Sequence, residues 1–156
     1  MVDWVVKLKE EKEQQGKISE LESSNRALVE NLLTLEFPKR CQEVSEEIDA
    51  CVETHNALYH KNPRKKVEIS LLQGSKDWFR IIANPHGSNI VFVEVLFDLP
   101  DRAITFTSPT LGENANGDLL IDLATDNTVK IFLRNVGVIT PKNSARLILQ
   151  PILSVL

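Results

Sequence analysis

The chain of 156 residues is 42% hydrophobic and 26% charged, which suffices for one globular domain or for a smaller domain with an extended appendage. Its net charge of −4 is modest, so no overall positive charge favours nucleic acid or an anionic membrane surface as a partner. The longest apolar stretches are too short to cross a bilayer and no leader-like segment opens the chain, so we expect a soluble intracellular protein.

The first third of the chain is predicted to form a long helix with a heptad pattern. From residue 18 onward, apolar residues recur at alternating steps of three and four, which is typical of a coiled-coil seam. Asn25 occupies an a-type position, where a lone asparagine costs stability but fixes the register and the number of strands. The alternative is a single amphipathic helix packed on its own domain. The seam consists of Ile18, Leu21, Asn25, Leu28, Leu32 and Leu35.

Pro38 interrupts this pattern, because proline removes a backbone donor and clashes with the preceding turn. We therefore predict a coiled-coil stalk over residues 1–61 that is kinked near Pro38, or two helices that meet at a bend. An antiparallel helical hairpin remains an alternative, although no turn sequence lies near residues 36–39. The seam resumes out of phase with Phe37, Cys41, Val44, Ile48, Cys51, His55 and Leu58.

A straight helix over residues 4–60 would extend roughly 85 Å. A helix of that length and width cannot bury its own apolar seam. We therefore predict that a second chain covers it. The expected dimer interface comprises Ile18, Leu21, Asn25, Leu28, Leu32, Leu35, Phe37, Cys41, Val44, Ile48, Cys51 and Leu58.

Residues 62–156 are predicted to form a small α+β head. Asn62-Pro63 ends the helix, and four short apolar segments follow, joined by the turn sequences GSKD, NPHGSN and LPD. These segments indicate a four-stranded antiparallel meander. The third strand is apolar on both faces, so we expect it inside the sheet and covered on both sides. The strands begin near Val67, Trp78, Ile90 and Arg102.

The segment 118–136 fits two structures. Alternating apolar residues over 129–133 slightly favour a hairpin. Alternatively, Leu119 and Leu123 share one helical face, and Thr125 or Asp126 can cap a second short helix. Periodicity leaves both open.

The C-terminal segment is predicted to be helical. Thr140 suits the N-cap and Pro141 the first helical position, while Pro151 should limit or kink the helix. Its apolar face consists of Ala145, Ile148, Leu149 and Ile152.

Residues that can carry chemistry do not form a recognisable site. Cys51 and His55 have a spacing that can place two ligands on one metal ion, but both lie in the apolar seam and no second pair has ligand spacing. No nucleophile signature or phosphate-binding glycine run is present, so we expect no enzyme, metal or cofactor. Cys41 and Cys51 lie about 15 Å apart along a helix, too far for a disulfide. The basic residues within 60–66 are interpreted as a solvated junction.

The order of these elements resembles the kinetochore subunits that end in an RWD-like head. The residues that carry the resemblance are WFRIIANPHGSNIVFVEVLFDLPDRAITFTSPTL, which place a strand, an Asn-Pro turn and two further strands in sequence, followed by LLIDLATDNTVKIFLRNV. The likeness is greatest to the spindle pole component twenty-five family of the outer-kinetochore, microtubule-binding complex. It implies two helices over residues 118–136 and an RWD-like head, a four-stranded meander with C-terminal helices.

This resemblance implies a mechanical role in chromosome segregation. The stalk would pair with a homologous coiled-coil partner subunit in a heterodimer within a larger complex, and the paired heads would bind a centromere-side receptor peptide. The implied location is the nucleus, at the kinetochore of the chromosome's centromere, without direct contact with nucleic acid or membrane. No residues are assigned to the peptide site. The alternative function is a homodimeric coiled-coil adaptor with a peptide-binding sheet domain.

Overall fold

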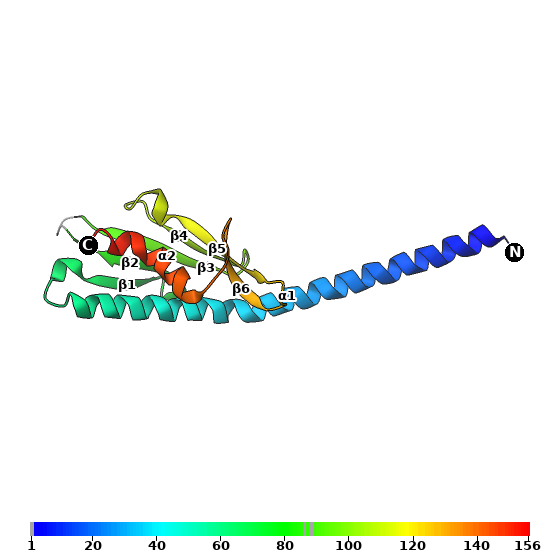
Figure 1. Cartoon of the computed structure of the whole chain (residues 1–156), viewed down its shortest axis with the longest axis horizontal. Helices are drawn as coiled ribbons and strands as arrows, with labels where there is room; N and C mark the ends of the chain where they lie inside the picture. Colours follow the sequence, from blue (N-terminus) through cyan, green and yellow to red (C-terminus); the bar gives the residue numbers. More distant parts are fainter. Residues whose placement is uncertain (1, 86, 88) are drawn as a thin grey trace.

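The protein is an α+β molecule in which one long helix extends beyond a sheet (Figure 1). The computed structural model describes residues 2–85, 87 and 89–156, so His86 and Ser88 of the expected NPHGSN turn lie outside the described residues. The elements are helix α1 (Asp3–Leu58), a 3-10 turn (Pro63–Lys65), strands β1 (Val67–Leu72), β2 (Ser75–Ala83), β3 (Val91–Asp98) and β4 (Ala103–Thr107), a second 3-10 turn (Glu113–Ala115), strands β5 (Gly117–Leu123), β6 (Val129–Leu133) and β7 (Gly137–Ile139), and helix α2 (Pro141–Leu153).

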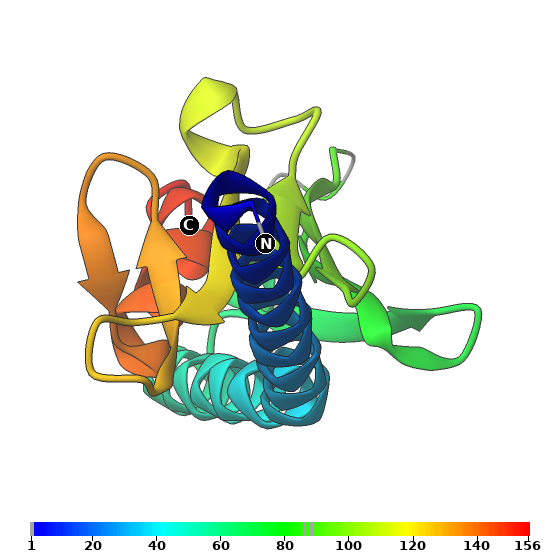
Figure 2. The ribbon, with the colours of Figure 1, turned by 90° about the vertical axis from the view of Figure 1, so that its right-hand side faces the viewer.

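The strands form one seven-stranded sheet in the order β1-β2-β3-β4-β5-β6-β7, and every neighbouring pair is antiparallel. The predicted meander is therefore correct for β1 to β4, but the prediction of four strands is wrong, since three more strands continue the same path. Figure 2 shows the sheet from the end of the molecule, with the projecting part of α1 toward the viewer.

The core lies between one face of this sheet and the two helices. Strand register aligns the inward residues, with Ile81 opposite Val93 and Ile121 opposite Ile131, and all four are buried. The second half of α1 contacts β1, β5, β6 and α2, and α2 contacts β3. Both helices therefore cover the same face, and apolar residues alternate toward them with the two-residue period of a half-buried sheet.

The other face of the sheet is only partly covered, which corrects the expectation for the third strand. β3 does lie inside the sheet, but Leu96 is 38% exposed and Phe92 is half-buried. Glu94 accepts hydrogen bonds on this face from Trp78 Nε1 at 2.7 Å and from Arg80 Nε at 3.2 Å. On this outer face, large side chains pack against one another around the Arg80–Glu94 ion pair. This packing explains why the face needs no second layer of helices.

Residues 118–136 form the β5–β6 hairpin, so the prediction of two helices is wrong. Asp126 Oδ1 accepts hydrogen bonds from the Thr128 backbone N at 3.1 Å and from Thr128 Oγ1 at 2.6 Å, and Asn127 has φ 64°. These bonds, with Lys130 nearby, lower the pKa of Asp126 to about 2. Aspartate and asparagine are suited to a tight turn as well as to a helix cap, so these residues do not distinguish the two structures. The segment adopts the hairpin that its alternating apolar residues favour.

Helix α2 agrees with its prediction. Thr140 Oγ1 accepts a hydrogen bond from the Asn143 backbone N at 3.1 Å, which is the N-cap contact, and Pro141 opens the helix. Pro151 lies in the last turn, and the helix ends at Leu153. The four residues of the predicted apolar face are buried, namely Ala145, Ile148, Leu149 and Ile152.

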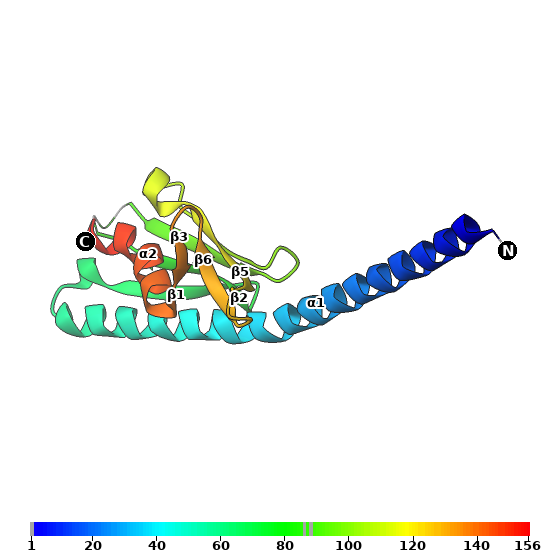
Figure 3. The same ribbon diagram turned by 45° about the vertical axis from the view of Figure 1, so that its right-hand side comes forward.

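Helix α1 is continuous through Pro38, and Figure 3 shows it bending where it leaves the sheet. It does not divide into two helices or fold back as a hairpin. Its buried residues extend from Leu33 to His55 and join the same core cluster as the sheet. The core therefore includes much of residues 1–61, the region that the sequence predicts to be a separate stalk.

Two side chains on α1 fasten the first strand to the helix. Asn56 Nδ2 donates to the Val67 carbonyl at 2.8 Å, and Asn56 Oδ1 accepts from the Val67 backbone N at 2.9 Å. His55 Nε2 donates to the Lys65 carbonyl at 2.7 Å. The segment between helix and β1 is thus held by side chains from the helix, and the basic residues of 60–66 lie around this junction.

Candidate functional site

The expected dimer interface divides into two groups in the structure. The first group is exposed, and we refer to it as the N-terminal stripe: Ile18, Leu21, Asn25, Leu28, Leu32 and Leu35. The second group is largely covered by the chain itself, since Phe37, Cys41, Val44 and Ile48 are buried in the core, Cys51 is half-buried and only Leu58 is exposed.

The assignment of the second group to a dimer interface therefore needs correction. Phe37 and Ile48 pack in the core cluster with the sheet and α2, so they have no free surface to offer another chain. For this half of α1, the alternative of an amphipathic helix packed on its own domain applies. The sequence analysis also missed Leu33 and Val52, which are buried on the same face.

A signal for the buried face was present in the sequence. Val29, Leu33 and Phe37 recur at steps of four and begin a second apolar row before Pro38 is reached. Val29 packs against the core cluster, and Leu33 and Phe37 belong to it. Two apolar rows that overlap along one helix indicate two separate packing surfaces, because the rows point in different directions from the helix axis.

The two rows lie on nearly opposite sides of α1. At about 100° per residue, the centre of the N-terminal stripe and the centre of the buried row are roughly 150° apart around the helix axis. Two leucines only two positions apart show the division most directly, since Leu33 is 1% exposed whereas Leu35 is 69% exposed. The stripe thus stays uncovered even where the helix already lies on its own sheet.

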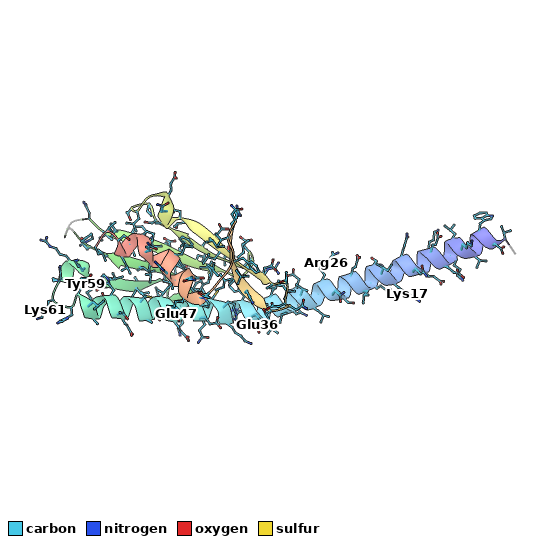
Figure 4. The ribbon with its side chains drawn as sticks, in the orientation of Figure 1. Lys17, Arg26, Glu36, Glu47, Tyr59 and Lys61 are labelled. Carbon is cyan, nitrogen blue, oxygen red and sulfur yellow. The ribbon has the colours of Figure 1, made fainter. Side chains whose placement is uncertain are left out.

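Residues 2–28 of α1 are not covered by the rest of the described structure. Every residue from 2 to 28 is exposed, and Figure 4 shows this part, with Lys17 and Arg26, projecting beyond the sheet. Gly16 weakens this part of the helix, although the Glu, Lys and Gln residues around it favour helix formation. Helices without tertiary packing are only marginally stable in water, so this part of α1 gains no stability from the rest of the chain.

Charged side chains surround the point where α1 leaves the sheet. Glu36 pairs with Lys39 at 3.1 Å and with Arg40 at 3.2 Å, and these contacts lower the pKa of Glu36. Arg102, in the β3–β4 turn, reaches Glu30 on the first half of the helix at 3.3 Å. Glu30 lies toward the buried row, so the contact helps to direct the helix without occupying the N-terminal stripe.

A second surface feature lies between the C-terminal parts of α1 and α2. It consists of two adjoining hollows of about 520 and 490 Å³ that share Cys51 and Leu153. His55 lines the first hollow, but its Nε2 is already bonded to the Lys65 carbonyl. Within the described part of the chain, no three His, Cys, Asp or Glu side chains are grouped so as to hold a metal ion.

None of the described helices combines the length and the apolar character that a bilayer span requires. No protein-family model matches the chain, no curated protein matches its sequence, and no solved structure matches it. The most distinctive feature of the described surface is the N-terminal stripe.

Proposed function

We propose that this protein is a non-enzymatic assembly subunit whose N-terminal stripe pairs with a helix of another chain. The observation that carries the proposal is the division of α1 into two apolar faces, of which the sheet covers only one. The head would then be carried at a fixed place in the assembly, because its core includes the continuation of the pairing helix. The protein would act as a structural adaptor.

The free energy of burial supports such pairing. Full burial of a leucine or isoleucine side chain contributes about 1.5–3 kcal/mol, whereas association costs about 4–15 kcal/mol in lost freedom. The apolar members of the stripe on two paired helices can together exceed that cost. Their alternating spacing of three and four residues is the one that knobs-into-holes packing uses.

A narrower candidate is the kinetochore subunit implied by the sequence resemblance. The observation in its favour is that β2, β3 and β4 follow one another as strands across the segment that carries the resemblance. On this hypothesis the partner is a homologous subunit, the head pair binds a centromere-side receptor peptide, and the location is the kinetochore in the nucleus. The β5–β6 hairpin removes the support that helices over 118–136 would have given.

The size of the native assembly tests the pairing role without assuming a partner. The tagged chain would be sedimented in extracts of its own cells and compared with the variant Leu28→Glu, which places a charge in the stripe. We expect the wild type to sediment as an assembly larger than one chain and Leu28→Glu to lose that mass. The matched control is Leu58→Glu, because Leu58 is also exposed on α1 but lies outside the stripe.

An unchanged sedimentation profile for Leu28→Glu would contradict the proposed role. The narrower candidate makes a separate demand, since the assembly must contain centromere components and must lose them in the same variant. If the mass is lost but centromere components were never present, the adaptor function holds and the kinetochore assignment fails.

A further inference from the structure

Charges beside the N-terminal stripe are arranged to suit a second copy of the same chain. With Asn25 and Leu32 at a positions and Leu28 and Leu35 at d positions, Lys17 occupies a g position and Glu22 the following e position. In a parallel coiled coil, a g residue faces the next e residue of the partner. Two identical chains in register would therefore pair Lys17 with Glu22 on each side of the seam.

Asn25 points to the same arrangement. In a parallel pair of identical chains, each Asn25 lies opposite the other, so that each amide finds a donor and an acceptor. In an antiparallel pair that keeps Ile18 to Leu35 in contact, an a residue faces a d residue, and Asn25 would lie opposite Leu28. That arrangement buries an amide against an apolar side chain, which is unfavourable.

The antiparallel arrangement also brings like charges together. There, e positions face e positions, which would place Glu22 of one chain near Glu36 of the other. Glu36 is already engaged by Lys39 and Arg40 of its own chain, so these cations are not free to screen a second carboxylate fully. Both the seam and its flanks therefore favour the parallel orientation.

The position of the head is compatible with this orientation. Leu33 occupies a b position of the heptad and Phe37 an f position, and both pack against the sheet. Glu30, which Arg102 contacts, is also at an f position. Because b and f positions point away from the partner in a coiled coil, two parallel chains would carry their heads on opposite outer sides of the pair.

The sequence limits the paired segment at both ends. Glu11 and Gln14 occupy the a and d positions before Ile18, and Lys39 and Gln42 occupy those after Leu35. Lys39 and Gln42 are exposed beside the sheet. The apolar seam therefore covers only residues 18–35, which is short for a coiled coil, so the pairing should be reversible on dilution.

We propose that the N-terminal stripe binds a second copy of this chain as a parallel, in-register homodimer over residues 18–35. This inference rests on the proposed pairing function and names its partner. It departs from the heterodimer implied by the sequence resemblance, because the matched pairs Lys17–Glu22 and Asn25–Asn25 arise within one sequence.

Single-cysteine cross-linking of the purified full chain tests the register. In a Cys51→Ser background, which leaves only the buried Cys41, we would introduce Asn25→Cys at the seam and Ser23→Cys at an outward f position. Oxidation should join Asn25→Cys chains into a covalent dimer and leave Ser23→Cys chains single. If Asn25→Cys forms a disulfide only when mixed with Leu28→Cys, the pair is antiparallel and the parallel homodimer is overturned.

A charge exchange tests the orientation by the sign of its effect, without cysteines. In the parallel homodimer, Lys17→Glu and Glu22→Lys each create like-charge contacts on both sides and should weaken dimerisation about tenfold, measured by sedimentation equilibrium. The double variant Lys17→Glu/Glu22→Lys should restore it. In the antiparallel pair, Glu22→Lys would instead meet Glu36 and strengthen binding, which would contradict the proposal.

The outcomes separate this inference from the function on which it rests. A purified wild-type chain that stays monomeric at all concentrations overturns the homodimer. If Leu28→Glu still reduces the size of the assembly in cell extracts, the pairing function survives with a different partner. If neither experiment shows association through the stripe, both proposals fail.

Discussion

The two halves of α1 share an apolar periodicity but lie in opposite environments. In the second half, apolar residues such as Val44 and Ile48 are fully buried against the sheet and α2. In the first half, Leu21 and Leu28 belong to a row with alternating steps of three and four, yet both are exposed. Helical periodicity thus shows that a face is apolar and does not show whether the chain itself or another chain covers it.

The boundary between the halves is marked by a change of face. Leu32 belongs to the exposed stripe and Leu33, the next residue, to the core. When a second apolar row begins on another face of a helix before the first row has ended, the sequence indicates two packing surfaces on that helix. We consider this overlap a more informative signal for assembly than the heptad pattern alone.

The largest expected difference between the faces is in stability. Phe37→Ala should reduce the free energy of unfolding by about 3–5 kcal/mol, because it removes a buried ring and leaves a cavity. Its matched control, Leu35→Ala, lies on the exposed face two residues away and should change the stability of the diluted monomer by less than about 0.5 kcal/mol. Urea denaturation of both variants at low protein concentration measures the difference. Equal losses would show that the two faces are not distinct.

The next effect concerns the attachment of β1 to the packed half. Asn56→Ala removes both hydrogen bonds to the backbone of the buried Val67 and should cost about 2–3 kcal/mol. Asn31→Ala is the control at an exposed position of α1, and it should be close to neutral. The denaturation midpoints of the two variants measure this difference in stability. An Asn56→Ala variant as stable as wild type would mean that packing alone holds β1 in place.

Pro38 gives a prediction of opposite sign. Pro38 lies inside α1, and an interior helical proline lacks a backbone donor and costs up to about 3 kcal/mol relative to alanine, part of which a bend in the helix can absorb. We expect Pro38→Ala to increase the free energy of unfolding by about 1–2 kcal/mol and to straighten α1. Denaturation and small-angle scattering measure both changes. A destabilised variant would show that the bend is needed for packing.

The effect that is smallest at neutral pH is an alkaline pH dependence of the packed half. Burial, and secondarily the charge of Asp77, raise the pKa of the Cys41 thiol to about 12 from its usual value of about 9. Since the pKa is higher in the folded state, the contribution of the thiol is complete below about pH 9 and is lost as the pH rises toward about 12.

Cys41→Val should therefore weaken the fall in stability between about pH 9 and 11 relative to wild type, as measured by urea denaturation at several pH values. A thiol on the other face provides the comparison, because Leu32→Cys places it in the stripe, where alkylation at pH 8 should be fast in the diluted protein while Cys41 remains unmodified. Rapid alkylation of Cys41 would contradict its burial in the packed face.

Local signals in the sequence were sufficient for several elements. The Thr140 cap with Pro141 defined the start of α2, and the alternation around Ile104 defined β4, because both depend on residues that are close in the chain. The N-terminal stripe was likewise predicted from its apolar spacing, and the structure shows its residues exposed in one row. The pairing of that stripe with another chain stays a prediction.

Other features depended on information that local patterns do not contain. The burial of Val44 and Ile48 follows from the sheet that lies against them, and that sheet has more strands than the sequence analysis allowed. The segment containing Asp126 suits a cap or a turn equally, and only the adjacent β4 edge decides between helix and hairpin. For residues 118–136, the family resemblance implied two helices, which was wrong, whereas the apolar alternation favoured the hairpin that the structure shows.

Hydrogen exchange along α1 at two protein concentrations tests the central contrast most directly. The account predicts that amides of residues 18–32 exchange rapidly in dilute protein and slowly in concentrated protein, because only a partner stabilises them. Amides around Val44 and Ile48 should be protected equally at both concentrations. Protection of residues 18–32 that does not depend on concentration, whether strong or absent, would contradict the assignment of the exposed face to a second chain.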